Sequence, residues 1–348
     1  MDDISPVSPE ARLKEAALAK AQGRHHHRGR AALWSRAWTV LKRVGVGVYT
    51  DGFIHAGNLA YLAILSIFPF IIVALAIAQL VGQSEGGVHT MQAVLDTLPT
   101  NVAEVLQGPL QDVIQARSGS LLWLGGILAL WSVGSFIETI RDIIRRAYGV
   151  KSGHPFWEYR LGSAALIVFA VVAIMLSFSV SLFLSGAQRF VTDLIPGADQ
   201  VIGLLALFRI VPGLLLFGSL YLLFYVLTPG RYRFTKCPKW PGAAFVAGWW
   251  VLTAAALPEV ISWLGGYDRT YGSLAGVAIA LLFFYLVGVG VVFGAELNAA
   301  LAETPTPSQE DVAAAVQEQR ADAAQQVAHE AAIDEAAAET EPEGRVEP

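Results

Sequence analysis

The chain has 348 residues, of which 54% are hydrophobic and only 15% are charged. A soluble domain carries nearer a quarter charged residues, so this composition is typical of an integral membrane protein. The only cysteine is Cys237, which excludes an intrachain disulfide and a cysteine-based metal site. The net charge of −5 is unevenly distributed, because residues 1–57 hold nine Lys or Arg while residues 303–348 hold twelve Asp or Glu. No apolar stretch before residue 56 has the character of a cleavable signal peptide.

The first 32 residues are polar and basic, and we expect them to form a disordered cytoplasmic arm. The triplet at residues 25–27, three histidines, could bind a metal, but the neighbouring arginines oppose a cation and favour a solvated arm. In residues 33–48, Trp and aliphatic residues share one helical face among basic residues. This pattern predicts either a helix in the bilayer interface, attracted to anionic lipid, or a plain extension of the first span.

Six apolar stretches are long enough to cross a bilayer core of about 30 Å at about 1.5 Å rise per residue. We place these spans at residues 56–80, 121–140, 161–184, 201–227, 241–263 and 273–301. The segment between the first two spans repeats apolar residues at helical spacing, interrupted at Gly108-Pro109. There we expect short amphipathic helices on the outer face. The predicted fold is therefore an all-α integral membrane protein with six transmembrane helices.

The predicted membrane domain covers residues 33–302, and an acidic tail rich in Ala and Glu follows at residues 303–348. Ala, Glu and Gln favour helix, so we expect the tail to be partly helical and otherwise mobile. Eighteen of the 24 Lys and Arg lie in residues 1–57, 141–160 and 228–240, whereas the three alternate loops hold one each. The positive-inside rule therefore places both termini in the cytoplasm, and an even number of spans agrees.

The last span carries small residues four positions apart, a spacing that lets another helix approach closely. Gly272, Gly276 and Ala280 form one such set. Gly290, Gly294 and Asn298 form a second set nearer the inner end. We predict that both sets lie at helix contacts.

Several segments carry a family resemblance. They are GNLAYLAILSIFPFIIV at 57–73, LLWLGGILALWSVGSFIETIRDIIRRAYGV at 121–150, HPFWEYRLGSAAL at 154–166 and YGSLAGVAIALLFFYLVGVGVVFGAELNAAL at 271–301. In wording, order and spacing the chain resembles the YihY/BrkB family of bacterial inner-membrane proteins, formerly labelled ribonuclease BN-like. The resemblance covers roughly residues 38–302 and implies six helices and an inner-membrane, cell-envelope location. It implies no settled biochemical activity. Arg145 is a departure, because the family often has Asn there.

The ribonuclease label conflicts with the chemistry of the loops. Metal-dependent RNA cleavage needs clustered Asp, Glu or His, or a paired general acid and base. The inner loops offer only scattered acids and one His among basic residues that the topology already explains. No nucleophile–base pair for another hydrolysis stands out either. We therefore predict no catalytic residues, no metal, no cofactor and no nucleic-acid partner.

Arg209 is the most informative single residue. It lies eight residues, or about 12 Å, into the fourth predicted span, where a buried Arg costs about 2.5–3.5 kcal/mol. It either binds an anionic group such as a phosphate or carboxylate, or it snorkels to the outer interface or pairs with Glu259. Pro69 and Pro212 fall in the first and fourth spans, where kinked helices could line the same site. Asn58 is a further candidate, although an interhelical hydrogen bond is its simpler explanation.

Glu138 and Glu296 lie at the inner ends of the second and sixth spans. With Glu259, each could relay protons or form an ion pair, and the ion pair is the favoured interpretation of Glu138 and Glu296. Their expected partners are Arg141, Arg145 or a loop Lys.

Two functions fit this pattern. The first is a transporter or translocator of an anionic lipid or a small anion, since six spans divide into two inverted halves of three. The second is a non-transporting envelope scaffold that holds partners with its basic arm, outer helical loop and acidic tail. In either case the surrounding membrane lipids are partners of the chain.

Overall fold

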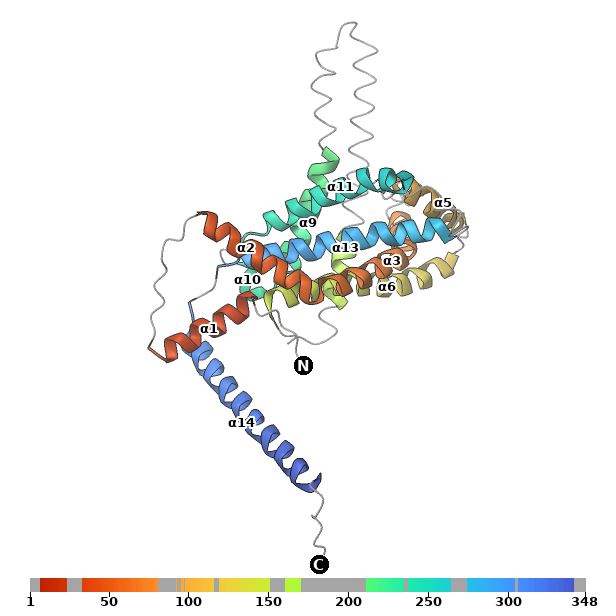
Figure 1. The fold of residues 1–348 in the computed structure, drawn as a ribbon. Helices are drawn as coiled ribbons and strands as arrows, with labels where there is room; N and C mark the ends of the chain where they lie inside the picture. Colours follow the sequence, from red (N-terminus) through yellow and green to blue (C-terminus); the bar gives the residue numbers. More distant parts are fainter. Residues whose placement is uncertain are drawn as a thin grey trace, which may run out of the picture.

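The structure is a computed structural model of the whole chain. It describes residues 7–23, 33–80, 92, 95–96, 98–115, 119–150, 160–169, 211–234, 237–263, 274–303 and 306–340. In these ranges every regular element is a helix, as predicted. Figure 1 shows an elongated bundle from which one long helix, α14, runs away from the rest.

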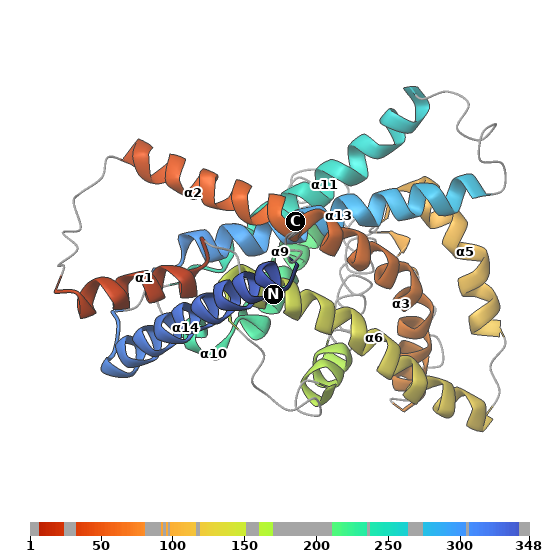
Figure 2. The same ribbon diagram turned by 60° about the horizontal axis from the view of Figure 1, so that its bottom comes forward.

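The described residues form the following helices in chain order. Their bounds are α1 Pro9–Ala21, α2 Leu33–Gly47, η1 Val48–Gly52, α3 Phe53–Leu80, α5 Thr100–Gln115, α6 Gly119–Tyr148, α9 Val211–Leu227, α10 Gly230–Arg233, α11 Trp240–Trp263, α13 Ala275–Leu301 and α14 Gln309–Thr340. A further helical stretch, Arg160–Phe169, lies beside α6 (Figure 2).

Two of the described helices, α11 and α13, are long and apolar enough to cross a membrane. Shorter apolar helices are Phe53–Ile67, Arg160–Phe169 and Leu216–Leu227. Helix α6 continues past the predicted end of the second span at residue 140, as far as Tyr148. Residues 170–184 and 201–210 of the third and fourth predicted spans lie outside the described residues, so the six-helix topology and its orientation stay predictions.

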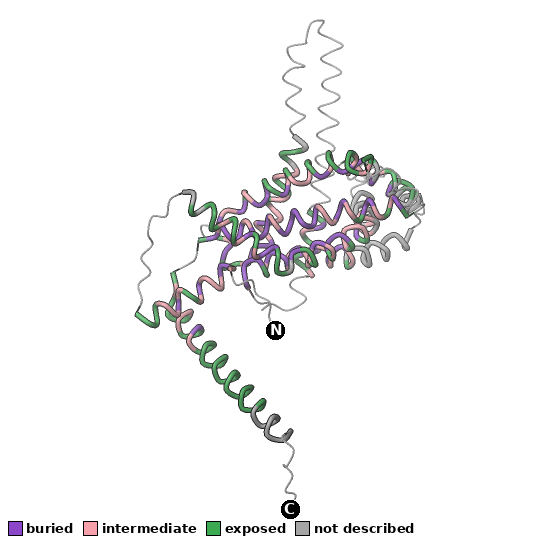
Figure 3. The backbone as a smooth tube through the Cα atoms, in the orientation of Figure 1, coloured by how far each residue is buried: buried purple, intermediate pink, exposed green. Residues whose placement is uncertain are grey.

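Helix α13 is the centre of the bundle and contacts α2, α3, α5, α6 and α11. Buried residues lie along most of its length (Figure 3). Glycines allow these close contacts, because a Cβ at Gly288 would lie 2.8 Å from the carbonyl oxygen of Ala56 on α3. At Gly290 a Cβ would lie 2.3 Å from the Trp249 ring of α11. The main apolar core therefore forms around a helix whose small side chains admit its neighbours.

The segment before the first span is helical and continuous with it. Helix α2 passes through the π-helical turn η1 directly into α3. Val44 and Val48 are buried against the bundle, whereas Trp38 and Leu41 remain exposed. The backbone of this segment is therefore a plain extension of the first span.

Helix α5 lies across one end of the bundle, against α13 and α3. Its Val102 and Leu106 are buried in a cluster with Ile279 and Phe283 of α13. The sequence predicted an interruption at Gly108-Pro109, but the structure has one continuous helix there. The apolar face of α5 packs on α13, and this packing stabilises the helix by more than the hydrogen bond missing at Pro109 destabilises it.

The two ends of the chain contain helices. Helix α1 lies in the arm expected to be disordered, which corrects that prediction, and the 32-residue helix α14 lies in the tail expected to be partly helical. Ser8 caps α1 by accepting a hydrogen bond from the Ala11 N–H at 3.2 Å. The first turns of α1 and α14 pack on each other, with Leu13, Ala17 and Ala315 buried (Figures 1 and 2). Each segment is ordered by the other, which the composition of either one alone does not reveal.

Candidate functional site

The predicted substrate-binding residues do not gather in the described structure. Arg209 lies outside the described residues. Pro212 is the second residue of α9, and Pro69 lies half-buried inside α3. Asn58 is exposed on α3, eleven residues before Pro69, which is about 16 Å along the helix. Asn58 and Pro69 therefore cannot hold one small group together.

The three predicted acids lie in different surroundings. Glu259 is exposed on α11, and its backbone carbonyl accepts a hydrogen bond from the Ser262 hydroxyl at 2.7 Å. Glu296 is buried on α13 beside Gly47 of α2. A Cβ added at Gly47 would lie 2.1 Å from the Glu296 carboxylate. Glu138 forms an ion pair whose partner is Arg160, not one of the expected residues Arg141 and Arg145.

Among the described residues, Arg160 and α6 form a compact group of charged and aromatic side chains. The Nε of Arg160 lies 3.2 Å from Glu138 Oε1. Its Nη1 donates to the carbonyl of Trp131 at 2.7 Å and to the Ser135 hydroxyl at 3.3 Å. The guanidinium carbon lies 4.1 Å from the centre of the Trp131 ring, a cation–π contact. We call Trp131, Gly134, Ser135, Glu138 and Arg160 the Arg160 cluster.

Gly134 makes room for this guanidinium, because a Cβ there would lie 2.9 Å from Arg160 Nη1.

The cluster opens onto the surface of the bundle. The side chains of Arg160 and Glu138 are 14% and 26% exposed, and Trp131 is 49% exposed. The neighbouring Leu161 is also exposed. The charges therefore sit at the edge of an apolar helix surface instead of deep between helices.

The Arg160 side chain reaches a long way along α6 for a residue that borders a loop. The guanidinium reaches Trp131, which precedes Arg141, the first basic residue of α6, by ten residues or about 15 Å. In membrane proteins, paired charges beside apolar helix surfaces commonly mark substrate or ion pathways.

Reasoning from sequence missed Arg160 because the residue was counted among the loop charges that set orientation. The available signal was its position at the first residue of an apolar stretch, one loop away from Glu138. Nothing in the spacing gives the direction in which the Arg160 side chain extends.

Asn298, near the end of α13, has a structural role: it connects α13 to the start of α11. Its Oδ1 accepts from the Gly242 N–H of α11 at 2.8 Å, and its Nδ2 donates to the Lys239 carbonyl at 3.1 Å. Asn298 is only 1% exposed. It thus caps the start of α11 from a neighbouring helix and satisfies a backbone N–H that has no partner within its own helix.

Basic side chains cap helix carboxyl ends in the same region. Arg12 of α1 donates to the carbonyls of Ala299 and Ala302 at 2.9 and 3.2 Å. Burial and the nearby Arg43 lower the pKa of Arg12 to about 10, so it remains a cation at neutral pH. Lys239 donates to two backbone carbonyls of the 232–233 turn at 2.8 Å each. These cations stabilise the negative ends of helix dipoles and donate hydrogen bonds to the carbonyls at helix ends, which have no partner within their own helix.

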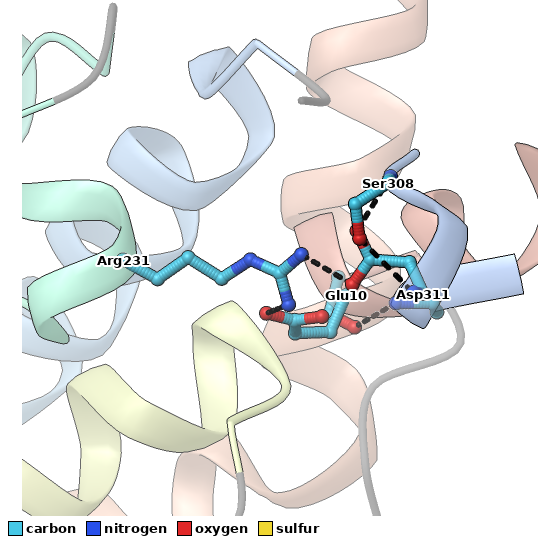
Figure 4. A network of polar contacts seen from close by, with 6 residues as sticks. Glu10, Arg231, Ser308 and Asp311 are labelled. Carbon is cyan, nitrogen blue, oxygen red and sulfur yellow. Dashed lines mark hydrogen bonds and ion pairs between the residues drawn. The ribbon is translucent and has the colours of Figure 1, made fainter. Parts of the chain in front are cut away.

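A group of ion pairs joins the two chain ends, and we call it the terminal clasp. Arg231 of α10 lies between Glu10 of α1, at 3.5 Å, and Asp311 of α14, at 2.7 Å (Figure 4). Lys14 of α1 contacts Glu318 of α14 at 3.0 Å. Hydrogen bonds from Ser308 and the contact with Arg231 lower the pKa of Asp311 to about 2.

Replacing Arg231 with alanine is expected to open the terminal clasp without unfolding the bundle. Exposed ion pairs contribute about 0–1 kcal/mol each, so the amides of α1 should exchange up to about fivefold faster in hydrogen–deuterium exchange. High salt should reduce the difference between variant and wild type. Arg320→Ala, at another exposed position of α14, is the matched control and should leave α1 exchange unchanged. Unchanged α1 exchange in Arg231→Ala would contradict the clasp.

The clasp also has a defined pH dependence. Because the folded pKa of Asp311 lies below its ordinary 3.8, its contribution is complete above that value and is lost as the pH falls through about 2. Protection of α1 should therefore stay constant from neutral pH down to about 4 and decline below it.

Comparison with known proteins identifies the relationship of this chain. The family described as virulence factor BrkB matches residues 49–319. The chain belongs to the BrkB family. This confirms the predicted resemblance, and the BrkB match extends past α13 into the first turns of α14.

Curated relatives of this BrkB family chain come from several bacteria. The putative ribonuclease-like protein YfkH of Bacillus subtilis (strain 168) is 27% identical over 254 residues, which cover 72% of this chain and 90% of YfkH. A UPF0761 membrane protein of Pseudoalteromonas translucida (strain TAC 125) is 27% identical over 257 residues, covering 71% of this chain and 80% of the relative. No solved structure matches. The BrkB chain is thus a membrane protein, while the ribonuclease-like wording belongs to the Bacillus protein.

Proposed function

We propose that the protein is an inner-membrane translocator of anionic lipids, with six spans and both termini in the cytoplasm. The observation that carries this proposal is the Arg160 cluster. It places a cation, its carboxylate partner and an exposed aromatic ring at the edge of an apolar surface, along a stretch of α6 that begins about 4 Å and ends about 15 Å from Arg141. A small soluble anion needs an enclosed path, whereas a lipid needs a polar edge whose side is open to its acyl chains.

The mechanism follows from the contacts of Arg160. A phosphate headgroup offers the guanidinium fork a bidentate partner in place of Ser135 and Glu138. Trp131 keeps one face of the guanidinium away from hydrocarbon, and the acyl chains remain in the bilayer beside the exposed Leu161. When the headgroup leaves, Glu138 again neutralises Arg160, so the empty site holds no uncompensated charge. Glu138 therefore acts as the built-in competitor that releases the lipid.

The sequence-derived candidates remain part of this proposal. Arg209, about 12 Å into the predicted fourth span, would be a second cation on the headgroup route. Pro69 and Pro212 would let the first and fourth spans bend around that route. Glu259 and Glu296 would be proton or ion-pair groups at its two ends.

A second candidate function is a non-transporting envelope scaffold. The observation that favours it is α14, whose side chains are exposed from Gln317 to Ile333 (Figure 3). A long acidic helix that leaves the bundle offers a binding surface for a basic partner. In that case the Arg160 cluster would only join the 160–169 helix to α6.

The test is lipid translocation in sealed proteoliposomes, measured with a short-chain fluorescent phosphatidylglycerol and a membrane-impermeant quencher. Wild type is compared with Arg160→Gln, which removes the cation, and with Arg146→Ala as a matched control. Arg146 makes an exposed ion pair with Asp142 at 2.8 Å on the same helix, outside the cluster. Translocation should fall roughly tenfold or more in folded Arg160→Gln, equivalent to losing about 1.4 kcal/mol, and stay unchanged in Arg146→Ala.

Two results would overturn the proposal. Wild-type flux no higher than in protein-free liposomes would remove anionic-lipid translocation and favour the scaffold. Equal flux in wild type and Arg160→Gln would remove the Arg160 cluster as the site. Because removal of Arg160 leaves Glu138 unpaired, the double variant Glu138→Gln/Arg160→Gln provides a neutral, folded version of the same test.

A further inference from the structure

Glu296 of α13 is a buried acid whose carboxyl group packs against the backbone of another helix. It is only 8% exposed, and it forms no hydrogen bond or ion pair with the described part of the chain. Its carboxyl group fills the space that a side chain on Gly47 would take, because a Cβ there would lie 2.8 Å from Glu296 Oε1. A charged carboxylate in this place would be uncompensated, which is costly in a packed interior, whereas a protonated carboxyl group is neutral.

The π-helical turn η1 places Gly47 against Glu296. Gly47 precedes η1 and Gly52 ends it, and a Cβ at Gly52 would lie 2.9 Å from Val292 of α13. Both glycines therefore face α13 although they are five residues apart. In an α-helix such residues differ by about 140° around the axis, so only one of them could face α13. A turn closed by i→i+5 hydrogen bonds brings residues five apart back to nearly the same face.

The same turn gives α2 a second arrangement. If η1 rewinds as α-helix, α2 rotates by about 100°, the step of one residue, and Gly47 leaves Glu296. The outer face of α2 leaves room for this rotation, because Trp38 and Leu41 are exposed. In both views the beginning of α2 also stands apart from α1 and α14 (Figures 1 and 2). The junction is thus an element with two discrete states that a charge at Glu296 can bias.

We propose that Glu296 is a proton-binding site that controls the docking of α2 on α13. With the proton bound, the neutral acid packs against Gly47, and η1 keeps its π-helical form. When the proton leaves, the carboxylate needs water or a cation, and it reaches them by displacing Gly47. The inference does not rest on lipid translocation.

Cations near the last turns of α13 are held by other groups. Arg43 of α2 donates to the Ala300 carbonyl at 3.5 Å, and Arg12 of α1 donates to two further carbonyls at the end of α13. Lys239, before α11, donates to the carbonyls of the 232–233 turn. Because Arg43 lies one helical turn from Gly47, it is the expected partner of Glu296 once the acid is ionised.

Other ionisable groups also lie on the elements that pack on α13. On α6, Asp142 and Arg146 pair with each other. The remaining groups are Tyr49 and Asp51 of η1, His55 of α3, and Arg141 and Arg145 of α6. Of the side chains that the structure describes, none of these forms an ion pair with Glu296. The test must therefore separate Glu296 from groups such as His55 that titrate in the same pH range.

The test is hydrogen–deuterium exchange of α2 in phosphatidylcholine nanodiscs from about pH 5 to about pH 9, corrected for the intrinsic exchange rate at each pH. Wild type is compared with Glu296→Gln, which is neutral at every pH. Glu303→Gln, which removes an exposed acid just beyond α13, is the matched control. Infrared spectroscopy follows the C=O band of a protonated carboxyl group, assigned to Glu296 by its loss in Glu296→Gln.

Because docking needs the neutral acid, protection of α2 in wild type should be highest at low pH and fall as the pH rises. The fall is at most tenfold per pH unit, the limit for the release of one proton. The infrared band should disappear over the same pH range. Glu303→Gln should follow wild type, whereas α2 of Glu296→Gln should stay protected throughout. Protection that does not vary with pH in wild type, or that varies equally in Glu296→Gln, would overturn the proposal.

A second pair of variants tests the same contact from α2. In Gly47→Ala the added Cβ takes the place of the carboxyl group, so α2 should exchange at low pH as fast as wild-type α2 does at high pH. Gly45→Ala is the control, because nothing lies within 4 Å of a Cβ there. Equal protection of α2 in these two variants would overturn the proposal, whether or not Glu296→Gln folds.

Discussion

Replacing Gly242 with alanine is expected to separate α11 from α13 and to lower the melting temperature of the protein in detergent. A Cβ at Gly242 would lie 2.3 Å from the backbone carbonyl oxygen of Gly294 and 2.4 Å from the Asn298 amide nitrogen. A backbone oxygen cannot rotate away, so the helices themselves must move. Overpacking of this kind costs about 1–3 kcal/mol, and the backbone contact puts Gly242→Ala at the upper end of that range.

Gly248→Ala on the same helix is the matched control. Nothing lies within 4 Å of a Cβ at Gly248, which is exposed. There the substitution removes only the conformational freedom of glycine, which costs a helix roughly 0.5–1 kcal/mol relative to alanine. The two substitutions should therefore change the melting temperature in opposite directions. Equal effects would mean that the contact between Gly242 and Gly294 does not limit the packing of α11 on α13.

The same contact shows how far sequence patterns reach. Spacing of four residues marked Gly290, Gly294 and Asn298 as a packing stripe, and all three are buried on α13. Gly276 is half-buried and Ala280 is buried farther along the helix, while Gly272 lies outside the described residues. Periodicity describes one helix at a time, however, so it does not name the partner helix.

The helical class and the bounds of α11 and α13 follow from the length of apolar runs, which is a local property. The order of the two chain ends is not local. Helix α1 has only Pro9, Leu13 and Ala17 buried, and α14 has no continuous apolar face. What orders them is their contact with each other and with Arg231, which lies 80 positions from Asp311 and 221 from Glu10 along the chain. A basic arm and an acidic tail viewed separately both resemble solvated segments.

The Arg160 cluster is a similar case. Its Glu138 was a candidate from sequence, because an acid near a span end is conspicuous. Arg160 looked like an ordinary positive-inside charge, and only the fold shows that its side chain extends toward Trp131. A charge count explains why a loop is basic, but it does not show which of its residues turn back toward the apolar surface.

Replacing Asn298 with alanine is expected to destabilise the bundle through two buried hydrogen bonds. The variant leaves the Gly242 N–H and the Lys239 carbonyl without their side-chain partner. A buried polar group that loses its partner costs about 1–3 kcal/mol, so the melting temperature in detergent should fall clearly. A change no larger than that of an exposed substitution such as Gln317→Ala would contradict this role.

Asn298→Asp separates the two bonds. An aspartate still accepts from the Gly242 N–H, but it has no amide to donate to the Lys239 carbonyl, and it brings a buried carboxylate toward that oxygen. If the second bond matters, Asn298→Asp is no more stable than Asn298→Ala despite keeping the cap on α11.

The double variant Gly242→Ala/Asn298→Ala completes the test. A Cβ at Gly242 would clash with both the Asn298 side chain and the Gly294 backbone. Shortening Asn298 to alanine removes the first clash and leaves the second. The losses should therefore be less than additive, yet the double variant should still melt below either single one.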